Sequence, residues 1–316
     1  MRIGWIGVHA EGLAALEAVC ATEYDVVGFM TLKQEKADRR CGSVSYESIC
    51  ERYQIPQHEV KHVNDESSLS ILRSWDCDLL VVLGWGQILN DQALKTAKIG
   101  VVGAHASLLP RNRGSAPVNW AIIKGESETG NSLIWLEEGV DSGNLIDQRS
   151  FPITAYDTCS TIYDRVAESN RAMLLDLLLE LEEGKVPGRP QVATDDRVLP
   201  RRRPKDGVIN WNSRGEDIYN LVRALARPYP GAFAFLNGKN YRVWKAAMLP
   251  PREPIAPPGT VLGPVKSPEN NACGVLVATA DGALLVLELE DENGCVLSGR
   301  DLSEQNWTGW RLRHAA

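Results

Sequence analysis

Two ionisable residues, His105 and Asp141, stand where short apolar runs of the sequence end. His105 follows the run Gly100–Ala104, and Asp141 lies in a glycine-flanked turn after Ser132–Leu136. An aspartate beside an imidazole orients the ring and stabilises its charged form, which suits proton transfer. Each residue also has a structural interpretation, since a single histidine is often a core residue and aspartate often forms turns. If both runs are strands of one sheet, we expect Asp141 to approach His105.

The loop that begins at His105 contains the most specific pattern in the chain. Its sequence from 105 to 126 is HASLLPRNRGSAPVNWAIIKGE, with corners at Ser107, Pro110, Arg113, Gly114 and Pro117. A loop with such fixed corners at the end of a strand is suited to hold a ligand. The pattern therefore favours a binding or catalytic role over a plain connection.

The elements that must position these residues alternate between strands and helices. Continuous apolar runs predict strands at Arg2–Gly7, Asp25–Met30, Leu79–Leu83 and Gly100–Ala104, and helical spacing predicts helices at Glu11–Ala21, Ser45–Tyr53, Asp65–Trp75 and Asp91–Thr96. This alternation is typical of an α/β fold with a doubly wound, mostly parallel, Rossmann-like sheet. Ligands bind beyond the carboxyl ends of the strands in such sheets, where His105 and Trp85-Gly86-Gln87 lie.

The second half of the chain does not continue the alternation of strands and helices. Asp157–Gly184 predicts one long helix, and residues 186–207 are rich in proline and arginine and predict a linker. Short strand-like runs then follow, separated by the turn pairs Asn237-Gly238, Asp281-Gly282 and Asn293-Gly294, which are typical of hairpins in a small β-rich open barrel. We expect a catalytic domain at 1–190, a linker at 191–206 and a β-rich domain at 207–316.

The composition limits the class of protein. The chain has 316 residues, a formal net charge of −7, 44% hydrophobic and 24% charged residues, which fits a globular protein of two domains without a strongly basic surface. The seven cysteines are odd in number and form no CxxC pair, which argues against a disulfide framework and against a structural zinc site, and we expect no metal. No signal peptide and no apolar run of about 18 residues is visible, so we expect a cytoplasmic protein without a membrane partner.

Dinucleotide binding is disfavoured by the turn after the first expected strand. Its sequence, GWIGVHAEG, departs from the GxGxxG pattern, and Gly28-Phe29-Met30-Thr31 supplies no acidic residue after the second strand. A nicotinamide-dependent oxidoreductase is therefore a weak alternative.

Several spaced motifs resemble the 10-formyltetrahydrofolate-dependent formyltransferase family. The matching residues are His105, Ser107-Leu108-Leu109-Pro110, Arg113-Gly114, Pro117 and Asp141-Ser142-Gly143, and further matches at 201–204, 206–211 and 227–232 extend over nearly the whole chain. The resemblance implies transfer of a formyl group from 10-formyltetrahydrofolate to an amine. It assigns His105 to oxyanion stabilisation or proton transfer, and Asp141 to orienting and charging His105 or relaying the proton.

The resemblance also implies which residues surround the two substrates. The folate-binding candidates are Leu83, Gly84, Trp85, Gly86, Gln87, Ile88, Leu89, Ser107, Leu108, Leu109, Pro110 and Val140. The candidates for binding the amine acceptor are Arg113, Gly114 and Asn119. Trp85 is equally well interpreted as a half-buried packing residue.

One position departs from the family pattern. Two residues before the histidine the family has an asparagine, which is thought to hydrogen-bond the formyl oxygen, and this chain has Gly103. Loss of one such donor typically costs about 10²–10³ in rate. Either another donor replaces it, from Gln87, Asn119 or Ser107 or from a backbone N–H near Gly103, or the activity is low, or the acceptor chemistry differs.

The identity of the acceptor is the most open prediction. Residues 31–47 and 116–120 look closer to the amino-sugar formyltransferases, so we expect the acceptor to be a small amine, namely an amino sugar of a sugar nucleotide. The alternative is a methionyl-tRNA formyltransferase, whose phosphate contacts would come from Lys33, Lys36, Arg39, Arg40 or the arginines at 201–203. An alternative of another class is a folate-binding module with little transfer activity. A homodimer is a further possibility.

Overall fold

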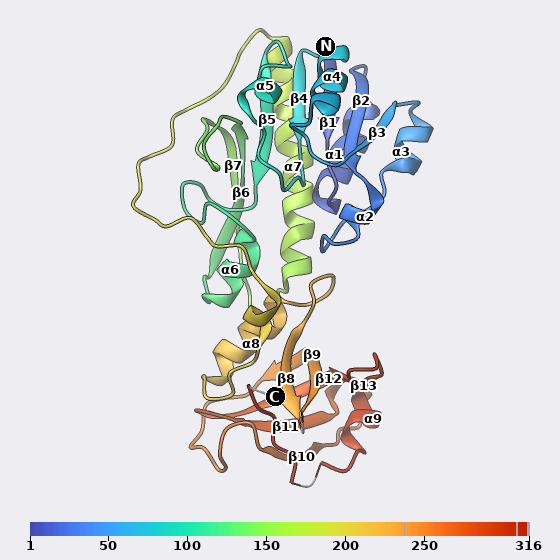
Figure 1. The fold of residues 1–316 in the computed structure, drawn as a ribbon. Coiled ribbons are helices and arrows are strands. Elements are labelled where there is room, and N and C mark those ends of the chain that lie inside the picture. The colour runs from blue at the N-terminus through green and yellow to red at the C-terminus, as the bar shows by residue number, and fades with distance from the viewer. Residues whose placement is uncertain (237, 308, 315–316) are drawn as a thin grey trace. The chain divides into compact units, whose positions relative to one another are not determined.

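A seven-stranded sheet forms the centre of the first structural unit (Figure 1). Its strands are β1 (Arg2–Ile6), β2 (Asp25–Leu32), β3 (Gln57–Val60), β4 (Leu79–Val82), β5 (Gly100–His105), β6 (Glu128–Trp135) and β7 (Leu145–Pro152). The strand order is β3-β2-β1-β4-β5-β6-β7; the strands from β3 to β5 are parallel, and β6 and β7 join antiparallel. The predicted mostly parallel Rossmann-like sheet is confirmed.

Helices cover both faces of this sheet. The helices of the first unit are α1 (Leu13–Cys20), α2 (Gln34–Ala37), α3 (Glu47–Arg52), α4 (Glu66–Ser74), α5 (Asp91–Leu94) and most of α7 (Cys159–Glu182). Most of α6 (Pro117–Ile123) belongs to the second unit. One core cluster joins α1, α3 and α7 to one face of the sheet, and a second joins α4 and α5 to the other face. Because side chains alternate along a strand, β4 is buried at all four residues, which explains its continuous apolar sequence.

The edge strands were not apparent from the sequence. Strand β3 reads QHEV and β7 reads LIDQRSFP, so neither has the apolar run of a central strand. An edge strand pairs on one side only and tolerates polar residues. Strand β5 also extends one residue beyond the predicted end, because His105 pairs with Ser132 of β6.

The second unit contains an antiparallel β-rich sheet of six strands, as predicted. They are β8 (Ala232–Leu236), β9 (Lys239–Met248), β10 (Val261–Val265), β11 (Gly274–Thr279), β12 (Gly282–Glu290) and β13 (Val296–Ser298), with α8 (Gly215–Ala224) and α9 (Gly299–Ser303). The path of the sheet is β10-β11-β12-β9-β8, with β13 on β12. Its core includes Trp211, Val222 and Val243. The expected turns at Asp281-Gly282 and Asn293-Gly294 join β11 to β12 and β12 to β13.

The computed structural model describes residues 1–236, 238–307 and 309–314, so Asn237 of the third expected turn lies outside the described residues. The first unit comprises Met1–Val118, Glu128–Pro152 and Thr161–Pro200; the second comprises Asn119–Ser127, Ile153–Ser160 and Arg201–Ala316. The predicted boundaries at 190 and 206 stay a prediction.

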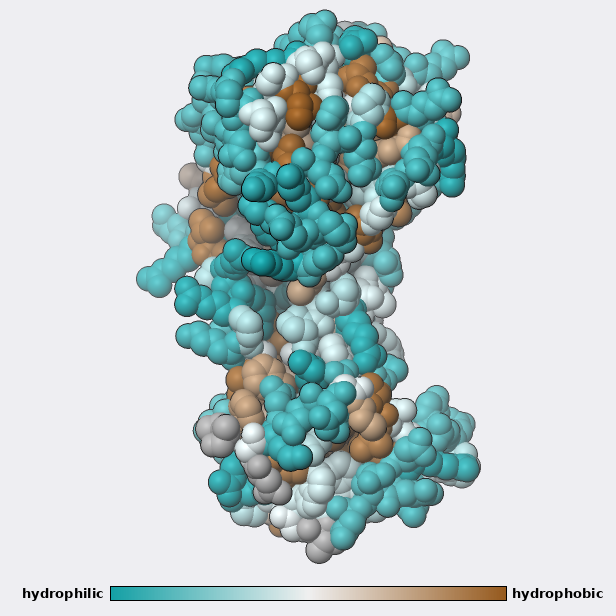
Figure 2. Space-filling model, turned by 45° about the vertical axis from the view of Figure 1, so that its right-hand side comes forward, coloured by the Kyte–Doolittle hydropathy of each residue, from teal (hydrophilic) through white to brown (hydrophobic). Residues whose placement is uncertain are grey.

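Hydrophilic residues predominate on the face drawn in Figure 2, where apolar residues form separate small groups. In the part of the chain that the structure describes, we find no helix with the length and apolar character needed to cross a membrane.

Candidate functional site

The side chains of His105 and Asp141 meet at the carboxyl end of β5. The imidazole Nδ1 lies 3.4 Å from Asp141 Oδ2, and the ring is 8% exposed. The same Asp141 oxygen accepts the backbone N–H of Gly114 at 2.9 Å. One carboxylate oxygen therefore contacts both the ring and the loop that follows the ring.

The other ring nitrogen faces a carbonyl group. His105 Nε2 lies 2.8 Å from the backbone oxygen of Asn112. A carbonyl oxygen can only accept a hydrogen bond, so Nε2 carries a hydrogen in this arrangement. Nδ1, on the other side of the ring, faces the Asp141 carboxylate.

Two polar residues of the neighbouring strands hold the start of the His105 loop. Ser132 Oγ donates to the Ser107 carbonyl at 2.6 Å and accepts the Leu109 N–H at 3.1 Å. Gln148 Nε2 donates to the Leu109 carbonyl and to Ser132 Oγ, both at 2.9 Å. Sequence reasoning missed Ser132 and Gln148; the one available signal was a polar residue within each strand segment.

The space beside Gly103 is filled by Leu136. Gly103 and His105 point to the same face of β5, and Gly103 is buried. A Cβ atom on Gly103 would lie 2.7 Å from Leu136 Cδ2 and 3.0 Å from Cδ1. Leu136 packs against a small cluster that contains Leu109. The family asparagine would therefore need Leu136 to move.

The three side chains expected to replace the asparagine already have hydrogen-bond acceptors. Ser107 Oγ donates to the Arg111 carbonyl at 2.7 Å, and Gln87 Nε2 donates to the Lys61 carbonyl at 3.2 Å. In the second unit, Asn119 Nδ2 donates to the Ala224 carbonyl at 2.6 Å. Within the first unit, the side-chain donors of Ser107 and Gln87 are therefore directed to these backbone carbonyls.

The loop after β4 combines buried anchors with exposed apolar groups. Leu83 and Leu89 point into the core, whereas Ile88 is 62% exposed. The Gly84 carbonyl accepts the backbone N–H groups of Val8 and His9, which joins this loop to the loop after β1. The buried Trp85 Nε1 has no hydrogen-bond partner among the described residues. In the Asp141 turn, Val140 is 43% exposed.

The other candidates occupy the His105 loop. Leu109 is buried, and Leu108 and Pro110 beside it are partly buried. The Arg113 guanidinium donates to Gln191 Oε1 at 2.6 Å. Gly114 has a φ of +107° and lies so close to Leu199 that a side chain would collide with its backbone.

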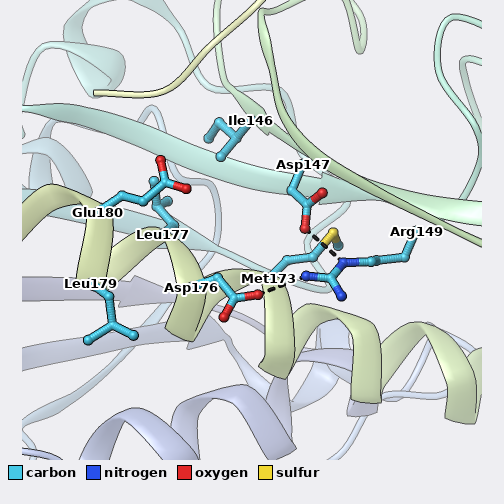
Figure 3. Close-up of a pocket in the computed structure, with 8 residues that line it drawn as sticks. All are labelled: Ile146, Asp147, Arg149, Met173, Asp176, Leu177, Leu179 and Glu180. Carbon is cyan, nitrogen blue, oxygen red and sulfur yellow. Dashed lines mark hydrogen bonds and ion pairs between the residues drawn. The ribbon is translucent and has the colours of Figure 1, made fainter. Parts of the chain in front are cut away.

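A hollow of the first unit is lined by residues of β7 and α7 and contains none of these candidates (Figure 3). It is lined by Ile146, Asp147, Arg149, Met173, Asp176, Leu177, Leu179 and Glu180. Arg149 lies between two carboxylates, donating to Asp147 at 2.8 Å and to Asp176 at 2.7 Å. Gln148 faces Leu109 instead, because successive side chains of a strand alternate.

Two titratable groups with shifted pKa values lie in the loop after β1, beside Gly84. Burial raises the pKa of Glu11 to about 7. Burial, together with the charge of Arg40, lowers the pKa of His9 to about 4. Both groups are therefore held away from their charged forms at this edge of the sheet.

Two family patterns cover most of the chain. The pattern described as Formyl transferase matches residues 17–178, and that of the formyl transferase C-terminal domain matches residues 202–306. The chain belongs to the formyl transferase family. The predicted 10-formyltetrahydrofolate-dependent formyltransferase is confirmed by this membership.

Curated relatives of this formyltransferase span nearly its full length. It is 32% identical to the methionyl-tRNA formyltransferase of Symbiobacterium thermophilum over 292 residues, covering 92% of this chain and 88% of that protein. It is 33% identical to the methionyl-tRNA formyltransferase of Caldanaerobacter subterraneus subsp. tengcongensis, covering 92% of this chain and 93% of that protein.

Solved structures share the fold at lower identity. HypX from Aquifex aeolicus in complex with tetrahydrofolic acid has a TM-score of 0.65 and 20% identity, over 94% of this chain and 46% of that chain. WlaRD, a sugar 3N-formyl transferase, has a TM-score of 0.62 and 17% identity, over 93% of this chain and 99% of that chain.

The expectation of an amino-sugar acceptor, with tRNA as the less favoured partner, is wrong. Three curated relatives at 30–33% identity are methionyl-tRNA formyltransferases, whereas the sugar formyltransferase WlaRD is 17% identical. The motifs around His105 and Asp141 belong to the formyl-transfer step that these enzymes share, so they carry no information about the acceptor. The short segments 31–47 and 116–120 were too little sequence to decide it.

We predict that Gly103→Asn destabilises the protein through Leu136. Overpacking a core in this way costs about 1–3 kcal/mol of unfolding free energy. Leu136→Ala makes room for the asparagine, so a double-mutant cycle by denaturant unfolding should show a favourable coupling of about 1 kcal/mol or more. If the changes in unfolding free energy of the two substitutions were simply additive, Leu136 would not occupy the space beside residue 103.

We predict that Glu11→Gln raises stability at high pH only. The unfolded chain ionises Glu11 near its ordinary pKa of 4.5, whereas the folded protein retains the proton up to about 7, so stability falls as the pH rises between these values. Glutamine removes this loss. Because Glu11 is partly exposed, solvent screens its charge, so we expect the unfolding free energy to rise by about 1–2 kcal/mol near pH 8 and not to change near pH 4. The measurement is the Tm of both proteins at the two pH values. His9 is unchanged in both proteins, so its opposite dependence cancels. An equal gain at both pH values would contradict the raised pKa of this carboxyl.

Proposed function

We propose that this formyltransferase transfers the formyl group of 10-formyltetrahydrofolate to the amino group of methionyl-tRNA. The observation that carries the proposed acceptor is the alignment of this chain with methionyl-tRNA formyltransferases over 92–95% of its length. The contact of His105 with Asp141 supports the formyl-transfer step itself. An amino-sugar acceptor lacks support of this kind.

In this proposal, His105 and Asp141 stabilise the charge that develops when the formyl carbon is attacked. Attack by the amine places negative charge on the formyl oxygen. The proton that the amine loses would pass through the Asp141 carboxylate to N10 of the departing tetrahydrofolate as the bond between the formyl carbon and N10 breaks. The doubly protonated His105 ring would supply an N–H donor to that oxygen, exchanging its present bond with the Asn112 carbonyl. Asp141 would hold the ring in position and keep it charged.

Because the family asparagine is absent, stabilisation of the negative formyl oxygen would depend more on His105. Gly103 has no side-chain donor, and the side chains of Ser107 and Gln87 donate elsewhere. A charged donor forms a stronger hydrogen bond than a neutral amide, so the imidazolium offsets part of the lost asparagine.

The residues around the strand ends fit the donor substrate. The exposed Ile88 and Val140 offer apolar contacts to an aromatic ring system, and the half-buried Trp85 lies in the same loop as Ile88. Leu83, Gly84, Gly86, Gln87 and Leu89 would shape this loop, and Ser107–Pro110 the loop beside it. Arg113 and Gly114 would lie toward the acceptor.

Contacts to tRNA phosphates would come from local basic groups, because the chain carries a formal net charge of −7. Arg201 and Arg203 are exposed, whereas Arg202 lies over the Trp120 ring at 5.0 Å and donates to the Asp206 carbonyl. In the first unit, Lys33, Lys36 and Arg39 are exposed around α2. We place the reaction in the cytoplasm, where the seven free cysteines of the described residues would stay reduced.

The proposed function predicts that the protein formylates methionyl-tRNA and not amino-sugar nucleotides. The purified protein, given 10-formyltetrahydrofolate, should release tetrahydrofolate and form formyl-methionyl-tRNA, but show no transfer to a panel of amino-sugar nucleotides. Tight binding of the donor without transfer to any acceptor would instead support a folate-binding module. Transfer to a sugar nucleotide in preference to methionyl-tRNA would contradict the proposal.

The same assay tests the basic residues. The double change Arg201→Glu and Arg203→Glu should raise KM for methionyl-tRNA by roughly tenfold or more at low salt and flatten its salt dependence, because two phosphate contacts are lost. The kcat should change little. Arg252→Glu, an exposed arginine elsewhere in the second unit, serves as the matched control. An equal effect of the control would show general electrostatics rather than contacts at 201 and 203.

A further inference from the structure

The segment from 187 to 199 crosses both loops of the His105–Asp141 site, although its composition is that of a linker. The Pro187 carbonyl accepts Trp135 Nε1 at 2.6 Å, and Arg189 exchanges two backbone hydrogen bonds with Leu145. At the other end, the Leu199 N–H donates to the Arg113 carbonyl at 2.7 Å, and the Leu199 carbonyl accepts the Ser115 N–H at 3.1 Å. The segment therefore connects the turn before β7 to the loop after β5.

Gln191 makes the central connection in this segment. Its Nε2 donates to the carbonyl oxygens of Asp141 and Gly143, both at 2.8 Å. Its Oε1 accepts Arg113 Nη2 at 2.6 Å. One carboxamide thus joins the Asp141 turn to the loop that contains Gly114, whose N–H binds the Asp141 carboxylate.

The Asp141 turn needs such support because its backbone is strained. Asp141 has a φ of +51°, in the left-handed region that a residue with a side chain seldom adopts. A conformation of this kind persists only where its surroundings hold it. The Asp141 side chain is 25% exposed, so packing alone does not fix it.

We propose that Gln191 is the positioning residue that sets the distance between Asp141 and His105. It acts through Asp141 and Arg113 and does not itself contact the ring. The kinetic part of this inference rests on the proposed function, whereas the geometric part concerns the His105 ring alone.

The test compares Gln191→Ala and Gln191→Glu with the parent protein. Both variants lose the two donor bonds to the Asp141 turn, and glutamate retains only an acceptor for Arg113. We expect kcat for methionyl-tRNA formylation to fall by about 10- to 100-fold in both, because small displacements of reacting groups are costly, with KM changed less than twofold.

A second measurement follows the ring directly. In ¹H–¹⁵N spectra of the histidine side chains, both Gln191 variants should shift the His105 Nδ1 signal in the same direction as Asp141→Asn does. Val192→Ala is the matched control, because Val192 is the next residue of the segment and is 76% exposed. It should leave kcat and the ring signal unchanged.

The inference is overturned if either Gln191 variant retains the His105 signal of the parent and a kcat within twofold of it. It is also overturned if Val192→Ala reproduces both changes. If the parent formylates no acceptor, the proposed function fails, but the ring signals still decide the role of Gln191.

Discussion

The geometry of the site depends on the two contacts of one Asp141 carboxylate oxygen. This oxygen faces His105 Nδ1 and accepts the Gly114 N–H, so it fixes the ring and the loop after the ring with the same atom. A carboxylate held by a backbone N–H keeps its orientation, which preorganises the ring before any substrate binds. The rest of the first unit can be understood as the means of bringing this oxygen to His105.

The sheet supplies that means through a change of strand direction. The parallel strands end at one edge, where β5 ends at His105, and the antiparallel β6 and β7 return the chain so that their connecting turn carries Asp141. Ser132 and Gln148 fix the start of the loop from these two strands. The segment after α7 then closes the arrangement from outside through Gln191. Distant parts of the chain therefore share one site.

The sequence was sufficient for the fold and the proximity of His105 and Asp141, because apolar runs identify central strands and turns follow them. It was insufficient where polar residues have a structural role. Strand β3, with the sequence QHEV, lacks an apolar pattern, and Gln191 stands in a segment typical of a linker. The position of Leu136 beside Gly103 depends on strand pairing that local sequence does not specify. The acceptor was misjudged because the clearest motifs serve the shared formyl-transfer step.

The most direct test of the central claim is single-turnover formyl transfer to methionyl-tRNA by Asp141→Asn beside the parent protein. Asparagine retains an oxygen for the Gly114 N–H but removes the charge that faces His105. The account predicts transfer by the parent and a fall on the order of 10²–10⁴ in the variant, with little change in Tm. A variant rate within twofold of the parent would contradict it.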